Sequence, residues 1–133
     1  MQRRGVRRFI HDPGLLEVRL RDGLRRLGLE SELWPGSDSY DLRIRFDDGE
    51  VWGIDAKDWE SAGLLARAFS WNPDPPCDRA FLVVAQHRCR GTQYLRELET
   101  ELEGRVSGVE VWSEDRFLTH AIAERIGRGR GGR

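Results

Sequence analysis

Two short segments joined by one turn constrain the fold of this chain most. Residues 40–46, YDLRIRF, alternate between apolar and charged side chains, and residues 51–57, VWGIDAK, form a second extended segment after the turn at 47–49. A period of two predicts strands with one buried face and one face left for polar groups. The two segments therefore predict a β-hairpin.

The hydrophobic pattern also predicts the register of this hairpin. A two-residue turn at 48–49 would mix apolar and charged side chains on both faces, whereas a three-residue loop at 48–50 gathers the apolar ones on one face. The predicted cross-strand pairs are Leu42 with Ala56, Ile44 with Ile54 and Phe46 with Trp52. The same register sets Asp41 opposite Lys57, and Arg43 opposite Asp55.

The rest of the chain alternates between helical and extended patterns. Helices are predicted from Asp12-Pro13 to Gly28 and over residues 59–71, 91–104 and 113–126, and strands over 31–35, 79–85 and 108–113. The order is α-β-β-β-α-β-α-β-α, without repeats or an internal linker. This order predicts an α/β fold.

Length and charge suggest one domain with basic ends. At 133 residues, the chain is predicted to form one domain over residues 11–126, between a basic arm at 1–10 and a Gly/Arg-rich tail at 127–133. The segment between these ends has a strong acidic excess, which is unfavourable for a stand-alone nucleic-acid binder. Another domain or subunit is therefore expected to deliver any nucleic-acid substrate.

The expected location is the cytoplasm. The chain has no apolar run of membrane-spanning length, and its start lacks the apolar region of a signal peptide. Cys77 and Cys89 are then expected to be reduced thiols.

Lys57 is the only lysine of the chain and lies two residues after Asp55. The face opposite the apolar one carries Asp41, Asp55 and Lys57 together. Two neighbouring carboxylates repel unless a cation lies between them, and Mg²⁺ prefers oxygen ligands. We expect Asp41, Asp55 and the backbone carbonyl of Ala56 to hold Mg²⁺, or Mn²⁺ in its place, with the compact Lys57 ammonium next to a bound water or phosphate.

Glu17 has two readings. It lies seven residues before Leu24, on nearly the same helical face, so that it is turned toward the sheet and is a candidate metal ligand, directly or through water. The alternative is a pair with Arg21 at helical spacing.

The segments YDLRIRF and GIDAK, preceded by a helix that bears Glu17, resemble the PD-(D/E)xK nuclease superfamily. The likeness covers roughly residues 11–112 in element order, with Tyr40 in place of the motif proline. It implies a restriction-endonuclease-like core, a mixed central sheet of about five strands flanked by helices on both faces. It also implies Mg²⁺-dependent cleavage of phosphodiester bonds in DNA by Asp41, Asp55, Lys57 and Glu17. The DAKDW ending is similar to endonuclease-like domains that accompany prokaryotic PIWI-type proteins in defence loci.

Other signals are weaker. Cys77, His87 and Cys89 do not have the spacing of a known zinc module. Trp52 and Trp112 are expected in the core, whereas Trp59 and Trp71 are candidates for a groove or a partner contact. A catalytically inactive nuclease-fold module that binds nucleic acid or protein stays open as the alternative function, as does a homodimer.

Overall fold

The computed structural model describes residues 15–33, 40–71 and 76–131. Its elements are α2 (Leu15–Arg26), β1 (Glu30–Leu33), β2 (Leu42–Arg45), β3 (Val51–Lys57), α3 (Ala62–Ala68), β4 (Arg79–Val84), the 3₁₀ turn η1 (Gln86–Arg88), α4 (Gln93–Leu102), β5 (Val109–Ser113) and α5 (Glu114–Gly131). The predicted order of helices and strands is confirmed. The start of the first helix at Asp12-Pro13, the basic arm and Trp34 lie outside the described residues.

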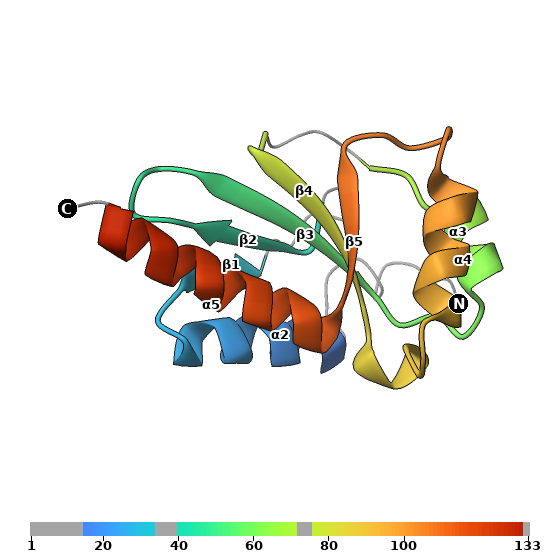
Figure 1. Ribbon diagram of the computed structural model, residues 1–133, viewed down its shortest axis with the longest axis horizontal. Coiled ribbons are helices and arrows are strands. Elements are labelled where there is room, and N and C mark those ends of the chain that lie inside the picture. The colour runs from blue at the N-terminus through green and yellow to red at the C-terminus, as the bar shows by residue number, and fades with distance from the viewer. Residues whose placement is uncertain (1–14, 34–39, 72–75, 132–133) are drawn as a thin grey trace, which may run out of the picture.

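The strands form one sheet in the order β1-β2-β3-β4-β5. The pairs β1–β2 and β2–β3 are antiparallel, and β3–β4 and β4–β5 are parallel, so the sheet is mixed. Helices α2 and α5 cover one face and α3 and α4 the other (Figure 1). No helix in the described part of the chain is both long and apolar enough to cross a membrane.

Two clusters of apolar side chains lie on the two faces of the sheet. The larger one joins leucines of α2 and Phe117 of α5 to Trp52 and Ile54 of β3. The smaller one joins α3 and α4 to Leu82 and Val84 of β4. Because successive strand residues point to opposite faces, Asp55 and Lys57 of β3 lie on the α3/α4 side.

The register of the β2–β3 hairpin differs from the predicted one by two residues. Leu42 pairs with Ile54 and Ile44 with Trp52, so the predicted pairs of Leu42 with Ala56, Ile44 with Ile54 and Phe46 with Trp52 are wrong. The predicted face of each side chain is kept, because a shift of two residues does not exchange the faces.

The loop explains the shift. The Phe46 backbone N–H donates to the Glu50 carbonyl at 2.9 Å, which leaves residues 47–49 as the three-residue loop instead of 48–50. Gly49 has φ +94°, the left-handed conformation that the last position of such a loop requires and that glycine adopts without strain. In this register Arg43 lies opposite Gly53 and not opposite Asp55. The Asp41 N–H donates to the Ile54 carbonyl, and the Asp41 carboxyl group lies next to that of Asp55 rather than opposite Lys57.

Helix α5 extends further than predicted. Part of the segment expected as a Gly/Arg-rich tail continues the helix to Gly131. Arg128 binds the carboxylates of Asp48, Glu50 and Glu124, and its guanidinium lies 4.2 Å from the centre of the Phe46 ring. These contacts join the end of α5 to the β2–β3 loop.

Gly53 determines how the segment before β2 lies on the sheet. A Cβ atom at this position would come within 2.9 Å of the buried Tyr40 ring and 3.0 Å of Cys77 Sγ. The Tyr40 ring also stacks on the Trp71 ring, with 5.3 Å between the two ring centres. The absence of a side chain at Gly53 therefore lets Tyr40 pack closely and places Asp41 next to it.

We expect Gly53→Ala to destabilise the fold by about 1–3 kcal/mol, because Tyr40 and Cys77 must move to admit the methyl group. Gly127→Ala in α5 is the control, since nothing lies within 4 Å of its added Cβ and alanine favours a helix by up to about 1 kcal/mol over glycine. Urea unfolding of both variants measures the difference. Equal stability of Gly53→Ala and the wild type would contradict the close packing.

Candidate active site

The candidate residues gather where β3 ends. Asp41 directly precedes β2, and Asp55 and Lys57 belong to the last three residues of β3. Since β3, β4 and β5 are parallel, their carboxyl ends meet at one edge of the sheet, which is the usual place for ligands in open α/β sheets. The structure brings Asp41, Asp55 and Lys57 together on one face, as the alternation predicts.

Backbone contacts hold Asp41 in place. Its N–H donates to the Ile54 carbonyl at 2.8 Å, and its Oδ2 accepts a hydrogen bond from the Ala56 N–H at 2.8 Å. Burial, followed by the negative charge and a hydrogen bond of Asp55, raises the pKa of Asp41 to about 8, although Lys57 and the Ala56 N–H act in the opposite direction. Asp41 is therefore a carboxyl group that holds a proton near neutral pH when no further cation is present.

Asp55 and Lys57 form an ion pair. Asp55 is only 8 % exposed, and its Oδ1 lies 2.8 Å from Lys57 Nζ. Burial lowers the pKa of Lys57, but the carboxylates of Asp55, Asp41 and Glu17 outweigh it and raise the pKa above its ordinary value. Lys57 is thus a cation at neutral pH. Its side chain is 31 % exposed, so solvent reaches this end of the site.

Glu17 is near the site but apart from the carboxylate pair. It lies in the first turn of α2, half-buried, and its charge acts on Lys57. Arg21, the alternative partner for Glu17, donates to Asp22 at 3.2 Å. Over the described ranges, no three His, Cys, Asp or Glu side chains come together as a metal-binding group.

The site nevertheless fits a hard divalent cation. Mg²⁺ is commonly bound through one or two carboxylates, with water and substrate phosphate completing its six ligands. Asp41 and Asp55 could supply such a pair, and a cation between them would relieve the repulsion that otherwise keeps a proton on Asp41. The carboxyl groups of Asp41 and Asp55 could thus hold such a cation, and Lys57 is in contact with one of them.

A charged rim next to the site was not foreseen from the sequence. Asp58 Oδ1 lies 2.9 Å from His87 Nε2 and accepts a hydrogen bond from Arg88 Nε at 2.8 Å. The contacts with His87 and Arg88 lower the pKa of Asp58. The sequence offered two signals for this rim: Asp58, the second acid of DAKD, and the polar residues 86–88 that follow the next strand. Their proximity depends on the parallel pairing of β3 with β4.

A second ion pair lies at the same edge of the sheet. Glu114, at the start of α5, is buried and accepts hydrogen bonds from Arg19 at 2.8 and 3.0 Å and from the Gln86 N–H at 3.0 Å. The hydrogen bond from Arg19 lowers the pKa of Glu114 most. Because Arg19 belongs to α2, this contact joins the helix of Glu17 to the end of the sheet.

The residues considered for a zinc site each have different neighbours in the structure. Cys77 lies over Gly53, Cys89 Sγ lies 3.6 Å from the Ala85 carbonyl, and His87 binds Asp58; both thiols are free.

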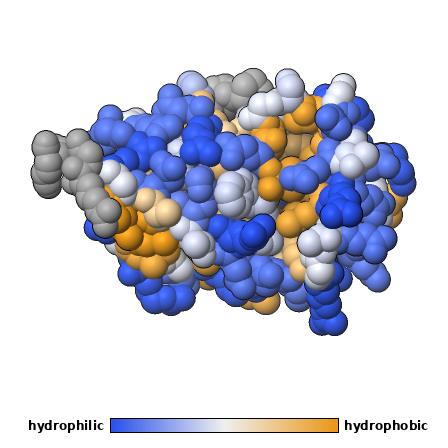
Figure 2. All heavy atoms as spheres, in the orientation of Figure 1, coloured by the Kyte–Doolittle hydropathy of each residue, from blue (hydrophilic) through white to orange (hydrophobic). Residues whose placement is uncertain are grey.

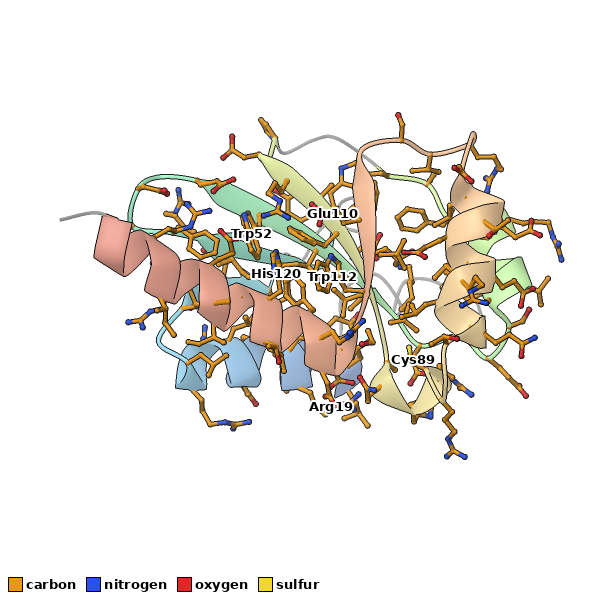
Figure 3. All side chains as sticks on the ribbon, in the orientation of Figure 1. Arg19, Trp52, Cys89, Glu110, Trp112 and His120 are labelled. Carbon is orange, nitrogen blue, oxygen red and sulfur yellow. The ribbon has the colours of Figure 1, made fainter. Side chains whose placement is uncertain are left out.

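The tryptophans divide between core and surface. Trp52 is fully buried, as predicted, and the half-buried Trp112 packs against the larger core cluster and stacks on His120 at 4.5 Å (Figure 3). Trp71 stacks on Tyr40, whereas Trp59 is exposed, with its carbonyl bound by the Tyr94 hydroxyl at 2.6 Å.

Comparison with known proteins identifies the family. A family described as "REase associating with pPIWI_RE" matches residues 14–130, almost the whole chain. No curated protein and no solved structure matches. The mixed five-stranded sheet with two helices on each face, the acidic pair with its lysine at the end of β3 and the family match agree with one another. The chain therefore belongs to this family of restriction-endonuclease-like domains that are associated with pPIWI_RE.

Proposed function

We propose that this domain is a Mg²⁺-dependent endonuclease that hydrolyses phosphodiester bonds in DNA. The observation that carries the proposal is the side-by-side placement of the Asp41 and Asp55 carboxyl groups, with Lys57 bound to Asp55, at the solvent-reachable end of β3. Membership of a restriction-endonuclease-like family supports the same reaction class.

In this mechanism Asp41 and Asp55 would hold the cation, with the Ala56 carbonyl and, directly or through water, Glu17 as further ligands. A bound Mg²⁺ supplies an activated water and stabilises negative charge on the phosphate. The Ala56 N–H keeps the Asp41 carboxylate oriented. Lys57 keeps its proton, because its pKa is raised, and therefore donates a hydrogen bond to the water or to a phosphate oxygen. Hydrolysis forms a bond from the water oxygen to phosphorus and breaks the bond from phosphorus to the leaving sugar oxygen. The water gives up one proton to solvent, and the leaving oxygen takes up one proton from solvent.

A protein partner is expected to present the DNA. The segment between the two basic ends has an acidic excess and would repel phosphates, except near its cationic groups. The family description names an association with pPIWI_RE, so we propose a pPIWI-type protein as the partner in a restriction or defence setting.

An inactive nuclease-fold module remains the second candidate. The Lys57–Asp55 ion pair favours it, since a salt bridge can replace a cation as the partner of a buried carboxylate. Even with that ion pair, however, the pKa of Asp41 stays raised. A purely structural site would gain nothing from such a carboxyl group.

We expect Mg²⁺ or Mn²⁺ to bind wild-type protein, and Asp55→Asn to lose most of this binding. Asp41 must release its proton, so that binding tightens as the pH rises toward about 8 and releases close to one proton per ion below that value. Titration calorimetry in buffers of different ionisation enthalpy measures both quantities. Glu60→Gln, an exposed acid outside the pair, is the control. Equal heats from wild type and Asp55→Asn would end the metal-site proposal.

The raised pKa also makes a prediction about stability. Between about pH 4 and about pH 8 the folded state holds a proton on Asp41 that the unfolded state has lost, so unfolding free energy falls as pH rises. Asp41→Asn should remove this pH dependence. In EDTA, its unfolding free energy should therefore rise relative to that of wild type by about 1–3 kcal/mol from the lower to the upper end of that range. Urea unfolding at both ends of the range checks it. Parallel pH profiles would contradict the buried carboxyl pair.

For activity, we expect plasmid cleavage in Mg²⁺ or Mn²⁺ that EDTA abolishes. Lys57→Ala should slow cleavage by about 10²–10³-fold, the usual effect of losing one group that stabilises charge in the transition state. Glu60→Gln should cleave like wild type. Because presentation of DNA is assigned to a partner, the assay includes the pPIWI-type protein. Metal binding without cleavage under these conditions would favour the inactive module.

A further inference from the structure

We infer that β5 is the surface through which two copies of this chain pair, so that the two sheets join into one. Strand β5 is the last in the sheet order and pairs with β4 on one side. On its other side, none of the described residues adds a strand. The strand lies at the front of the molecule in Figure 1, between α5 and α4.

The sequence of β5 lacks the usual protection of an edge strand. Natural edges carry proline, lysine or bulges that prevent pairing with another chain. Residues 109–113, VEVWS, contain neither proline nor lysine, and three of the five side chains are apolar. The one charge, Glu110, is neutralised by Arg79 at 2.7 Å and also accepts a hydrogen bond from Trp112. The strand is therefore suited to pair with another edge.

Two grooves flank β5 on the α4 side, with volumes of about 650 and 690 Å³. Both are lined by Glu99, Val111 and Trp112. Apolar side chains gather over the space between β5 and α4 (Figure 2). The half-buried apolar residues that line the grooves are Leu95, Val106, Val109, Val111 and Trp112.

The two grooves differ in charge. The groove beside the start of β5 is lined by Glu99, Glu103 and Glu110, and the groove beside its end by Arg96 and Arg116 together with Glu99. The side chains of Glu103, Arg96 and Arg116 are exposed. The edge thus has an acidic end and a basic end, separated by the apolar middle at Val111.

This polarity fits a second copy of the same chain. Antiparallel pairing about a two-fold axis at Val111 sets Val111 opposite itself and Glu110 opposite Trp112 of the second copy. It also places the acidic groove of each copy against the basic groove of the other, as an isologous interface requires. A parallel pairing of the same two edges would require a rotation about the strand direction, which would put the grooves of the two copies on opposite faces of the joined sheet and remove this match.

The test is the mass of the full chain in EDTA, by light scattering and sedimentation equilibrium, so that it does not depend on metal binding or cleavage. We expect a dimer with a dissociation constant of about 10 μM or tighter. Glu103→Arg and Arg116→Glu should each weaken it about tenfold or more by setting like charges across the interface. Glu101→Arg, exposed on α4 but outside both grooves, should dimerise like wild type.

Mixing the two single variants makes the test specific. An equimolar mixture of Glu103→Arg and Arg116→Glu should regain the dimer, because opposite charges then meet at both ends of the interface. Circular dichroism and melting of each variant confirm that it is folded. A monomeric wild type, unaffected single variants, or a mixture that stays monomeric would each overturn the proposed pairing.

Discussion

The apposition of Asp41 and Asp55 is the interaction on which the interpretation of this domain depends. The buried Asp55 and the half-buried Asp41 are held side by side, and the raised pKa of Asp41 is the energetic consequence. The backbone makes this unavoidable, because Asp41 is hydrogen-bonded to Ile54 and Ala56 and follows Tyr40, which Gly53 admits against the sheet. A fold that keeps such a cost in an otherwise well-packed sheet is expected to recover it in function.

The sequence was informative about faces and less so about positions along a strand. Alternation in YDLRIRF and VWGIDAK predicted correctly that Asp41, Asp55 and Lys57 share a face. It did not distinguish registers two residues apart, because both keep every side chain on its face. The choice depends on Gly49, whose positive φ favours the loop at 47–49. This difference decides whether the Asp41 carboxyl group lies opposite a lysine or next to another acid.

Contacts between distant segments could not be predicted from the pattern. Arg19 and Glu114 are 95 positions apart, and Asp58 meets His87 and Arg88 only because β3 and β4 are parallel neighbours. The end of α5 shows the opposite error: glycine and arginine suggested an unpacked tail, yet the helix continues and Arg128 has three carboxylate partners. Local propensity predicts such a segment poorly when tertiary contacts compensate for its glycines.

The carboxylate pair and the β5 edge belong to different strands of one sheet. Substitutions can therefore change one without the other, and the sheet fixes the distance between them. A two-fold axis perpendicular to the joined sheet keeps both carboxylate pairs on the same face. In the proposed dimer both copies of β4 and β5 would lie between the two copies of β3, so at the usual strand spacing the two sites would be about 24 Å apart. Loss of pairing would leave each carboxylate pair intact, since neither Glu103 nor Arg116 contributes to it. A change in cleavage pattern caused by those two substitutions, at unchanged metal affinity, would therefore report on cooperation between sites rather than on the chemistry of one.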